Sequence, residues 1–366
     1  MQQNQLMKKT AVYTLLFAIS ALVVIFYYCV NEVEIVMEDS QADIVQRTDT
    51  AIQEKSNNKS NNKSEDFQDK NSIIFEQSDQ EMGYFCVPLH EAVRAENVTI
   101  ENHYMDKELW ISIDQENNSK NFEDFYRTRG VYGNRDAVVE GYFEDGTDTF
   151  WLKFKLADIY EYHSIFENNK LYIEFVSPKE VYDKIVVIDP AYGGDITGAV
   201  SGKLESKKIT LEIAHALKEI LDETDIKVYY TRMDDSSPAD ENRIDLTNTV
   251  KADMMIRIEV NEDSDTKTYG TEAVYNSKFF IPGFGSVELA DLLEKEVVTA
   301  ISGKANGLFA STGEDEVIEK AIVPAAAIRV GYLSNGQEAI LLGREDYIQK
   351  IADGIYQAIL LAYEEY

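Results

Sequence analysis

Residues able to do chemistry lie in, or directly after, three strand-like segments in the second half of the chain. Asp189 closes the apolar segment 184–189, Arg257 and Glu259 lie in segment 254–260, and Arg329 lies in segment 325–330. Arg257 and Glu259 are two residues apart, so a strand would place both on one face. A carboxylate can bind a cation, whereas an arginine stays protonated and cannot accept a proton.

Histidine and cysteine, the usual zinc ligands, are scarce here. His215 is the one histidine of residues 184–366 and falls in the middle of a helical segment, where a tolerated polar residue is commoner than a ligand. Cys29 and Cys86 lie in separate segments without metal-site spacing, and two such cysteines define no disulfide framework.

Alternating strands and helices must position these residues. Apolar runs of strand length alternate with segments that carry apolar residues at helical spacing, as at Ile209, Ile213 and Leu217. This order predicts an α/β domain over residues 184–366, with a mostly parallel twisted sheet flanked by helices. Strands are expected at 184–189, 227–231, 254–260, 271–275 and 325–330, and helices at 207–223, 241–250, 286–301 and 345–363. In such sheets ligands bind beyond the carboxyl ends of the strands.

The same domain resembles the zinc-dependent N-acetylmuramoyl-L-alanine amidases, which cut peptidoglycan. Residues 188–194 read Ile-Asp-Pro-Ala-Tyr-Gly-Gly, where that family reads I-D-P-G-H-G-G. Further matching pieces follow in order: Gly198-Ala199, Thr231-Arg232, Arg243 with Asn248, Ala252-Asp253, Gly270 to Tyr275, Pro324, Gly331 to Asn335, and Ile351 to Ile355.

The resemblance implies a site that has lost its chemistry. Family members bind zinc with two His and one Glu, and a second Glu acts as general base on the bound water. The resemblance places the first His at Tyr192, the ligand Glu at Ser206, the second His at Glu259 and the catalytic Glu at Arg329. Glu205, next to Ser206, is the alternative for the ligand Glu. We therefore expect neither zinc nor a catalytic residue at these four positions.

A salt bridge is the natural replacement for that site. If both positions face the former metal, Glu259 and Arg329 would pair and spare each other the cost of an isolated buried charge, with Arg257 as a third member. The alternative is that both side chains point into solvent at a loop rim.

Three functions are compatible with these residues. The first is a non-catalytic pseudoamidase that binds peptidoglycan or its stem peptides, or regulates envelope enzymes. The second is an active amidase with a rebuilt site, using Asp189, Glu205 and Glu259 around a harder cation. The third is a structural element of a membrane-associated complex.

Residues 83–181 predict a small all-β domain that precedes the α/β domain. Apolar and polar residues alternate in segments 97–101, 108–114, 137–143, 150–156 and 170–176. The last two are similar to strands of AMIN domains, which carry some amidases to the wall. Several aromatic residues here could stack on sugars or could form the core: Tyr142, Phe143, Phe150, Trp151 and Tyr160.

The N-terminus predicts a membrane anchor and a tether. Residues 10–30 are uncharged and about as long as the ~20 residues of a transmembrane helix. Lysines precede this run and acidic residues follow it, so residues 1–9 are expected in the cytoplasm and the main domains outside the cell. The run ends in bulky residues, unlike a cleaved signal peptide. Residues 31–82 are polar and acidic, which predicts a disordered linker.

The charge balance limits the partners further. The formal net charge is −31, from 66 acidic and 35 basic residues. Such a surface repels phosphate backbones, so we expect no binding to nucleic acid.

Overall fold

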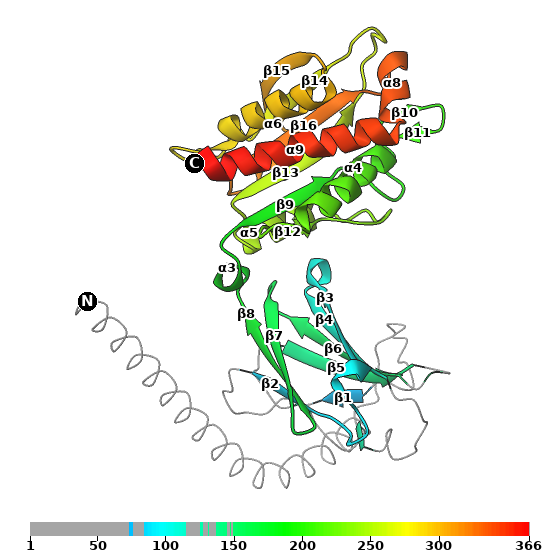
Figure 1. Ribbon diagram of the computed structural model, residues 1–366, viewed down its shortest axis with the longest axis vertical. Helices are drawn as coiled ribbons and strands as arrows, with labels where there is room; N and C mark the ends of the chain where they lie inside the picture. Colours follow the sequence, from blue (N-terminus) through cyan, green and yellow to red (C-terminus); the bar gives the residue numbers. More distant parts are fainter. Residues whose placement is uncertain are drawn as a thin grey trace, which may run out of the picture. The chain divides into compact units, whose positions relative to one another are not determined.

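A six-stranded sheet forms the centre of the C-terminal half (Figure 1). The computed structural model describes residues 73–75, 84–114, 125, 126, 131, 137–144, 147 and 149–365. The strand order of the sheet is β12-β9-β13-β16-β14-β15, and all neighbours are parallel except β14 and β16. The strands are β9 (Ile185–Pro190), β12 (Lys227–Tyr230), β13 (Met254–Asn261), β14 (Thr271–Tyr275), β15 (Ala305–Ala310) and β16 (Ala325–Tyr332).

Helices cover both faces of this sheet. Three long helices, α4 (Ser206–Leu221), α6 (Ser286–Ile301) and α9 (Glu345–Glu365), bury their apolar stripes against one face, where α9 packs on both α4 and α6. The opposite face carries the shorter helices α5 (Asp240–Thr249) and α7 (Glu316–Glu319). The helix α8 (Gly336–Leu342) and the hairpin of β10 (Val200–Ser201) and β11 (Leu204–Glu205) complete the domain.

Two antiparallel sheets precede this domain. One has the order β1-β5-β6-β4-β3, and the other has the order β2-β8-β7. Their strands are β1 (Ile73–Phe75), β2 (Phe85–Pro88), β3 (Val98–His103), β4 (Glu108–Asp114), β5 (Ala137–Phe143), β6 (Thr149–Leu156), β7 (Glu161–Glu167) and β8 (Lys170–Val176). Residues such as Leu109, Phe150, Phe154 and Ile173 are fully or almost fully buried and form one core between the two sheets. Single turns η1 (Ala95–Asn97) and η2 (Tyr104–Asp106) flank β3, and α3 (Pro178–Val181) leads on to β9.

Specific polar contacts join η2 and β7 to the edge strand β12. The Tyr104 hydroxyl donates to the carbonyl of Tyr230 at 2.9 Å and accepts from its N–H at 3.1 Å. Glu161 accepts a hydrogen bond from the Tyr229 hydroxyl at 2.5 Å and lies 2.8 Å from Lys227 Nζ. Because β12 is an edge strand, the outward N–H and C=O of Tyr230 have no neighbouring strand to pair with, and the Tyr104 hydroxyl bonds to both.

The predicted strands and helices of residues 184–366 are present, with boundaries shifted by at most two residues. The five alternating segments before residue 181 also form strands, and β1, β2 and β7 add to them. β1 lies inside residues 31–82, so the prediction of a disordered linker is wrong for residues 73–75, which pair with β5. The predicted anchor, residues 10–30, and most of the predicted linker lie outside the described residues. Within the residues described, no helix is both long enough and apolar enough to span a membrane.

Candidate functional site

The charged residues occupy the carboxyl half of one sheet face. Side chains alternate along a strand, so Val187 and Asp189 share a face, as do Met255, Arg257 and Glu259. The amino-terminal half of that face is apolar and packs under α5 and α7. Beyond these helices, charged side chains replace the apolar ones. Strand register then sets the pairs: Asp189 lies opposite Arg257, and Arg329 lies between Glu259 and Glu272.

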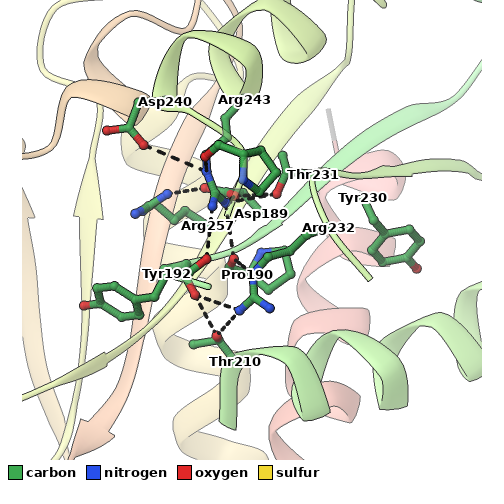
Figure 2. A network of polar contacts seen from close by, with 12 residues as sticks. Asp189, Pro190, Tyr192, Thr210, Tyr230, Thr231, Arg232, Asp240, Arg243 and Arg257 are labelled. Atoms are coloured by element: carbon green, nitrogen blue, oxygen red, sulfur yellow. Dashed lines mark hydrogen bonds and ion pairs between the residues drawn. The ribbon is translucent and has the colours of Figure 1, made fainter. Parts of the chain in front are cut away.

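Asp189 is the most deeply buried of these groups. It has no exposed surface, and it pairs with both Arg243 and Arg257 while the Thr231 hydroxyl donates to it at 2.5 Å (Figure 2). Burial alone would raise the pKa of Asp189, but the two guanidinium groups and the hydrogen bonds hold it below its ordinary value. Asp189 is therefore ionised and fully partnered.

Glu259 is bound through both carboxylate oxygens. Arg257 Nε lies 2.7 Å from Oε1, and Arg329 Nε lies 3.0 Å from Oε2. Burial would raise the pKa of Glu259, yet the charges of Arg257 and Arg329 lower it. The predicted Glu259–Arg329 ion pair is present, and Arg257 joins it as predicted.

Arg329 connects three carboxylates, although its side chain is 25% exposed. Besides Glu259, it contacts Glu272 at 3.2 Å and Asp315 at 3.1 Å. Glu272 also accepts hydrogen bonds from the hydroxyl of Tyr332 and the side-chain amide of Asn261, both at 2.8 Å. The sequence did not single out Glu272 or Asp315. Register across the antiparallel pair β14 and β16 could have indicated Glu272, whereas Asp315 lies in a loop with no such signal.

Tyr192 and Ser206 lie at the edge of this network. The Tyr192 ring packs so closely on Gly198 that a Cβ there would lie 2.8 Å from the ring and 2.8 Å from the Ser206 Cβ. Ser206 is fully buried, and its hydroxyl donates to the carbonyls of Ala199 at 3.3 Å and Val260 at 3.5 Å. Burial raises the pKa of Tyr192 to about 12, so its phenol stays protonated at neutral pH.

Glu205 and His215 do not join the site. The Glu205 carboxylate pairs with Lys208 at 3.1 Å, and His215 is exposed on α4. The structure therefore does not gather Asp189, Glu205 and Glu259, the residues named for the alternative of a rebuilt site, around one point. Glu205 precedes the helix and points to its surface, while Asp189 and Glu259 are held by arginines.

The family model described as N-acetylmuramoyl-L-alanine amidase matches residues 186–360. The germination-specific N-acetylmuramoyl-L-alanine amidase of Bacillus subtilis (strain 168) is 30% identical over 234 residues, which cover 59% of this chain and 95% of that protein. The chain belongs to the N-acetylmuramoyl-L-alanine amidase family.

Another relative and two solved structures each match about half of this chain. The B. subtilis protein YqiI is 29% identical over 182 residues, covering 50% of this chain and 86% of that protein. Among solved structures, the amidase of Clostridium difficile 630 is 29% identical with a TM-score of 0.47, covering 50% of this chain and 97% of that chain. The catalytic domain of the amidase CwlV from Bacillus (Paenibacillus) polymyxa is 29% identical with a TM-score of 0.46, covering 50% of this chain and 99% of that chain.

Proposed function

We propose that this protein is a catalytically inactive member of its amidase family that binds the cell wall or regulates envelope enzymes. The observation that carries the proposal is the double engagement of Glu259, whose two oxygens are bonded to Arg257 and Arg329. The two guanidinium charges that hold this carboxylate oppose the approach of a metal cation to it.

The residues present do not fit the zinc of the family. Tyr192 is a half-buried phenol that stays protonated, Ser206 offers a neutral hydroxyl, and Arg329 carries a permanent positive charge. In the described part of the chain, His, Cys, Asp and Glu nowhere form a group of three able to hold a metal ion. None of the three side chains Tyr192, Ser206 and Arg329 can hold a zinc-bound water or act as a carboxylate base.

The proposed ligand of the charged sheet face around Glu259 is peptidoglycan or its stem peptides, or an envelope enzyme that handles them. Family membership supports this choice, because several relatives are named N-acetylmuramoyl-L-alanine amidases. That name describes cleavage of the bond between muramic acid and alanine in peptidoglycan. We further propose that residues 10–30 anchor the protein in the membrane and that residues 31–82 tether the folded domains outside the cell.

Metal content and hydrolysis together test the proposal. We expect the purified full-length protein to contain no stoichiometric zinc by mass spectrometry, to keep its melting temperature in chelator, and to release no amine from purified sacculi. It should nevertheless co-sediment with those sacculi. One zinc per chain that survives dialysis, together with amine release, would establish the alternative of an active amidase.

A restored variant provides the matched control. The substitutions Tyr192→His, Ser206→Glu, Glu259→His and Arg329→Glu supply two imidazoles, one carboxylate ligand and one base. We expect this variant to bind zinc, with weak or no cleavage, because catalysis also needs geometry held to within about 0.5 Å. A folded variant that binds no zinc would show that the site was assigned to the wrong residues.

A further inference from the structure

An apolar loop connects β14 to α6 in the α/β domain. It spans residues 276–285 and contains the consecutive apolar residues Phe279, Phe280, Ile281 and Pro282. Phe280 is 85% exposed, more than any other large apolar residue in the described part of the chain. Single exposed apolar residues are normal on a protein surface, whereas a run of them indicates a contact surface.

Hydrogen bonds fix the base of this loop on the folded domain. Asn276 is almost completely buried, and its side-chain oxygen accepts from the N–H of Phe279 at 3.2 Å. Its side-chain nitrogen donates to the carbonyl of Ala321 at 2.9 Å. Ser277 contacts Ser311 through its N–H at 3.0 Å and through the two hydroxyls at 3.1 Å. The turn that leads into the apolar residues is therefore held from two neighbouring segments.

Both neighbouring segments carry further exposed apolar side chains. Ile322, which is 59% exposed, follows Ala321 in the chain. Phe309, which is 46% exposed, lies two residues before Ser311. We call Phe280, Phe309 and Ile322 the apolar patch.

The carboxylates of α7, next to the apolar patch, have lysine partners. Lys278 Nζ lies 4.0 Å from Glu319, and Lys320 pairs with Glu316. The local charge is therefore smaller than the formal net charge of −31 suggests. This pairing reduces the electrostatic repulsion that a membrane surface would exert on this part of the molecule.

The loop and the charged site lie at opposite edges of the sheet. β14 runs antiparallel to β16, so Tyr275 at the end of β14 pairs with Ala326 near the start of β16, whereas Arg329 lies further along that strand. α8 follows the end of β16, and Figure 1 shows α8 and the start of α6 at opposite ends of the sheet. A surface that covers the apolar patch therefore leaves the charged site uncovered.

We propose that the apolar patch inserts into the surface of a lipid bilayer and turns the charged site away from it. The inference rests on the anchor proposed at residues 10–30, because a few exposed rings alone bind a membrane weakly. As a flexible chain, residues 31–72 of the proposed tether would keep the folded part of the protein within roughly 35 Å of that bilayer. Insertion is then an intramolecular step at high effective concentration. Phe280 lies at the boundary of headgroups and acyl chains, and Glu259 and Arg329 face the cell wall.

Fluorescence quenching in lipid vesicles tests the proposal with the full-length protein. Phe280→Trp should be quenched in phosphatidylcholine vesicles whose acyl chains carry bromine, compared with vesicles of plain phosphatidylcholine. The wild type measures the contribution of Trp110 and Trp151, which lie in the β domain and should show no difference. Pro282→Glu, added to Phe280→Trp, places a charge at an exposed position of the loop. It should abolish the quenching and leave the melting temperature unchanged, because a carboxylate resists transfer into the bilayer.

Ile340→Trp is the matched control. Ile340 is 70% exposed, but it lies on α8 at the opposite edge of the sheet, so this variant should fluoresce equally in both kinds of vesicle. Quenching of Ile340→Trp to the same extent as Phe280→Trp would overturn the proposed orientation.

Flotation of the same vesicles in a density gradient separates this inference from the anchor on which it rests. Full-length protein that floats with the vesicles while Phe280→Trp stays unquenched overturns membrane insertion of the apolar patch and leaves the anchor in place. The patch is then a surface for another protein. Full-length protein that does not float overturns the anchor and the inference together.

Discussion

At the scale of single residues, the partners of Glu259 determine what its carboxylate can do. It lies where a ligand of a family zinc is expected, and it is still a potential ligand by residue type. Arg329 on one neighbouring strand and Arg257 on its own strand convert it into the centre of an ion-pair network. Residue type alone therefore does not tell whether Glu259 is a metal ligand or an ion-pair partner. Its contacts with Arg257 and Arg329 show that it is an ion-pair partner.

The Glu259–Arg329 pair should be energetically coupled. The two side chains are only 12% and 25% exposed, so Glu259→Gln is expected to cost up to about 3 kcal/mol by removing one of the carboxylates that neutralise Arg257 and Arg329. A double-mutant cycle with Arg329→Met, followed by urea unfolding, isolates the pair from the Arg257 contact. The exposed Arg344–Asp346 pair, 2.7 Å apart, is the control cycle and should show coupling below about 0.5 kcal/mol. Equal coupling in both cycles would contradict the buried-pair interpretation.

Asp189 should be the most sensitive carboxylate of the network. Asp189→Asn keeps the shape of the side chain but leaves Arg243 and Arg257 without their shared counter-charge in a fully buried position. We expect a loss of roughly 3–5 kcal/mol in the free energy of unfolding. Asp225→Asn removes a partner of Lys184 at an exposed position and should cost less than about 1 kcal/mol. Similar losses in the two variants would mean that Asp189 is not stabilised by its arginines.

At the scale of elements, the spacing of apolar residues predicts the bounds of helices and regular strands. It does not predict which strands lie side by side or which residues pair across them. Helices such as α6 and α9 carry apolar stripes that fix their length and packing face, and α6 has the bounds the sequence indicates. β7 has exposed residues at most positions, and β15 contains Asn306 and Gly307, so neither shows a clear strand pattern. The pairing of Arg329 with Glu272 required the antiparallel placement of β14, which no local pattern gives.

The contact of η2 with β12 gives a prediction at this scale. Because β12 is an edge strand, the outward N–H and C=O of Tyr230 depend on the Tyr104 hydroxyl. Tyr104→Phe leaves both groups without this partner and should cost about 1–3 kcal/mol, measured by thermal or urea unfolding. In the control Tyr162→Phe, the lost hydrogen bond to Ile100 is long, at 3.5 Å, and we expect a smaller change. A Tyr104→Phe protein as stable as the wild type would show that water replaces the hydroxyl.

At the scale of the whole molecule, the net charge and the buried carboxylates act in opposite directions as pH falls. Protonation of surface carboxylates relieves self-repulsion between pH 7 and the isoelectric point near 4.4. Buried Asp189 and Glu259 behave differently, because their pKa values in the folded state are below the ordinary values of 3.8 and 4.5. Their contribution to stability is complete above those ordinary values and is lost as pH falls through the lowered folded-state values.

We therefore expect stability to peak between roughly pH 4.5 and 6 and to fall steeply in more acidic solution. Urea unfolding of the wild type and of Glu259→Gln over pH 3–7 separates the two effects, because self-repulsion is nearly the same in both. The difference in unfolding free energy between them should be constant well above pH 4.5, the ordinary pKa of a glutamate. It should shrink below that pH, because the carboxylate then binds a proton more readily in the unfolded chain than in the folded one. Asp225→Asn, at an exposed site, should give a small difference with little dependence on pH. If the Glu259→Gln difference instead grew as the pH fell, Glu259 would be protonated more readily in the folded state than in the unfolded state. Its arginine partners could then not be what holds it ionised.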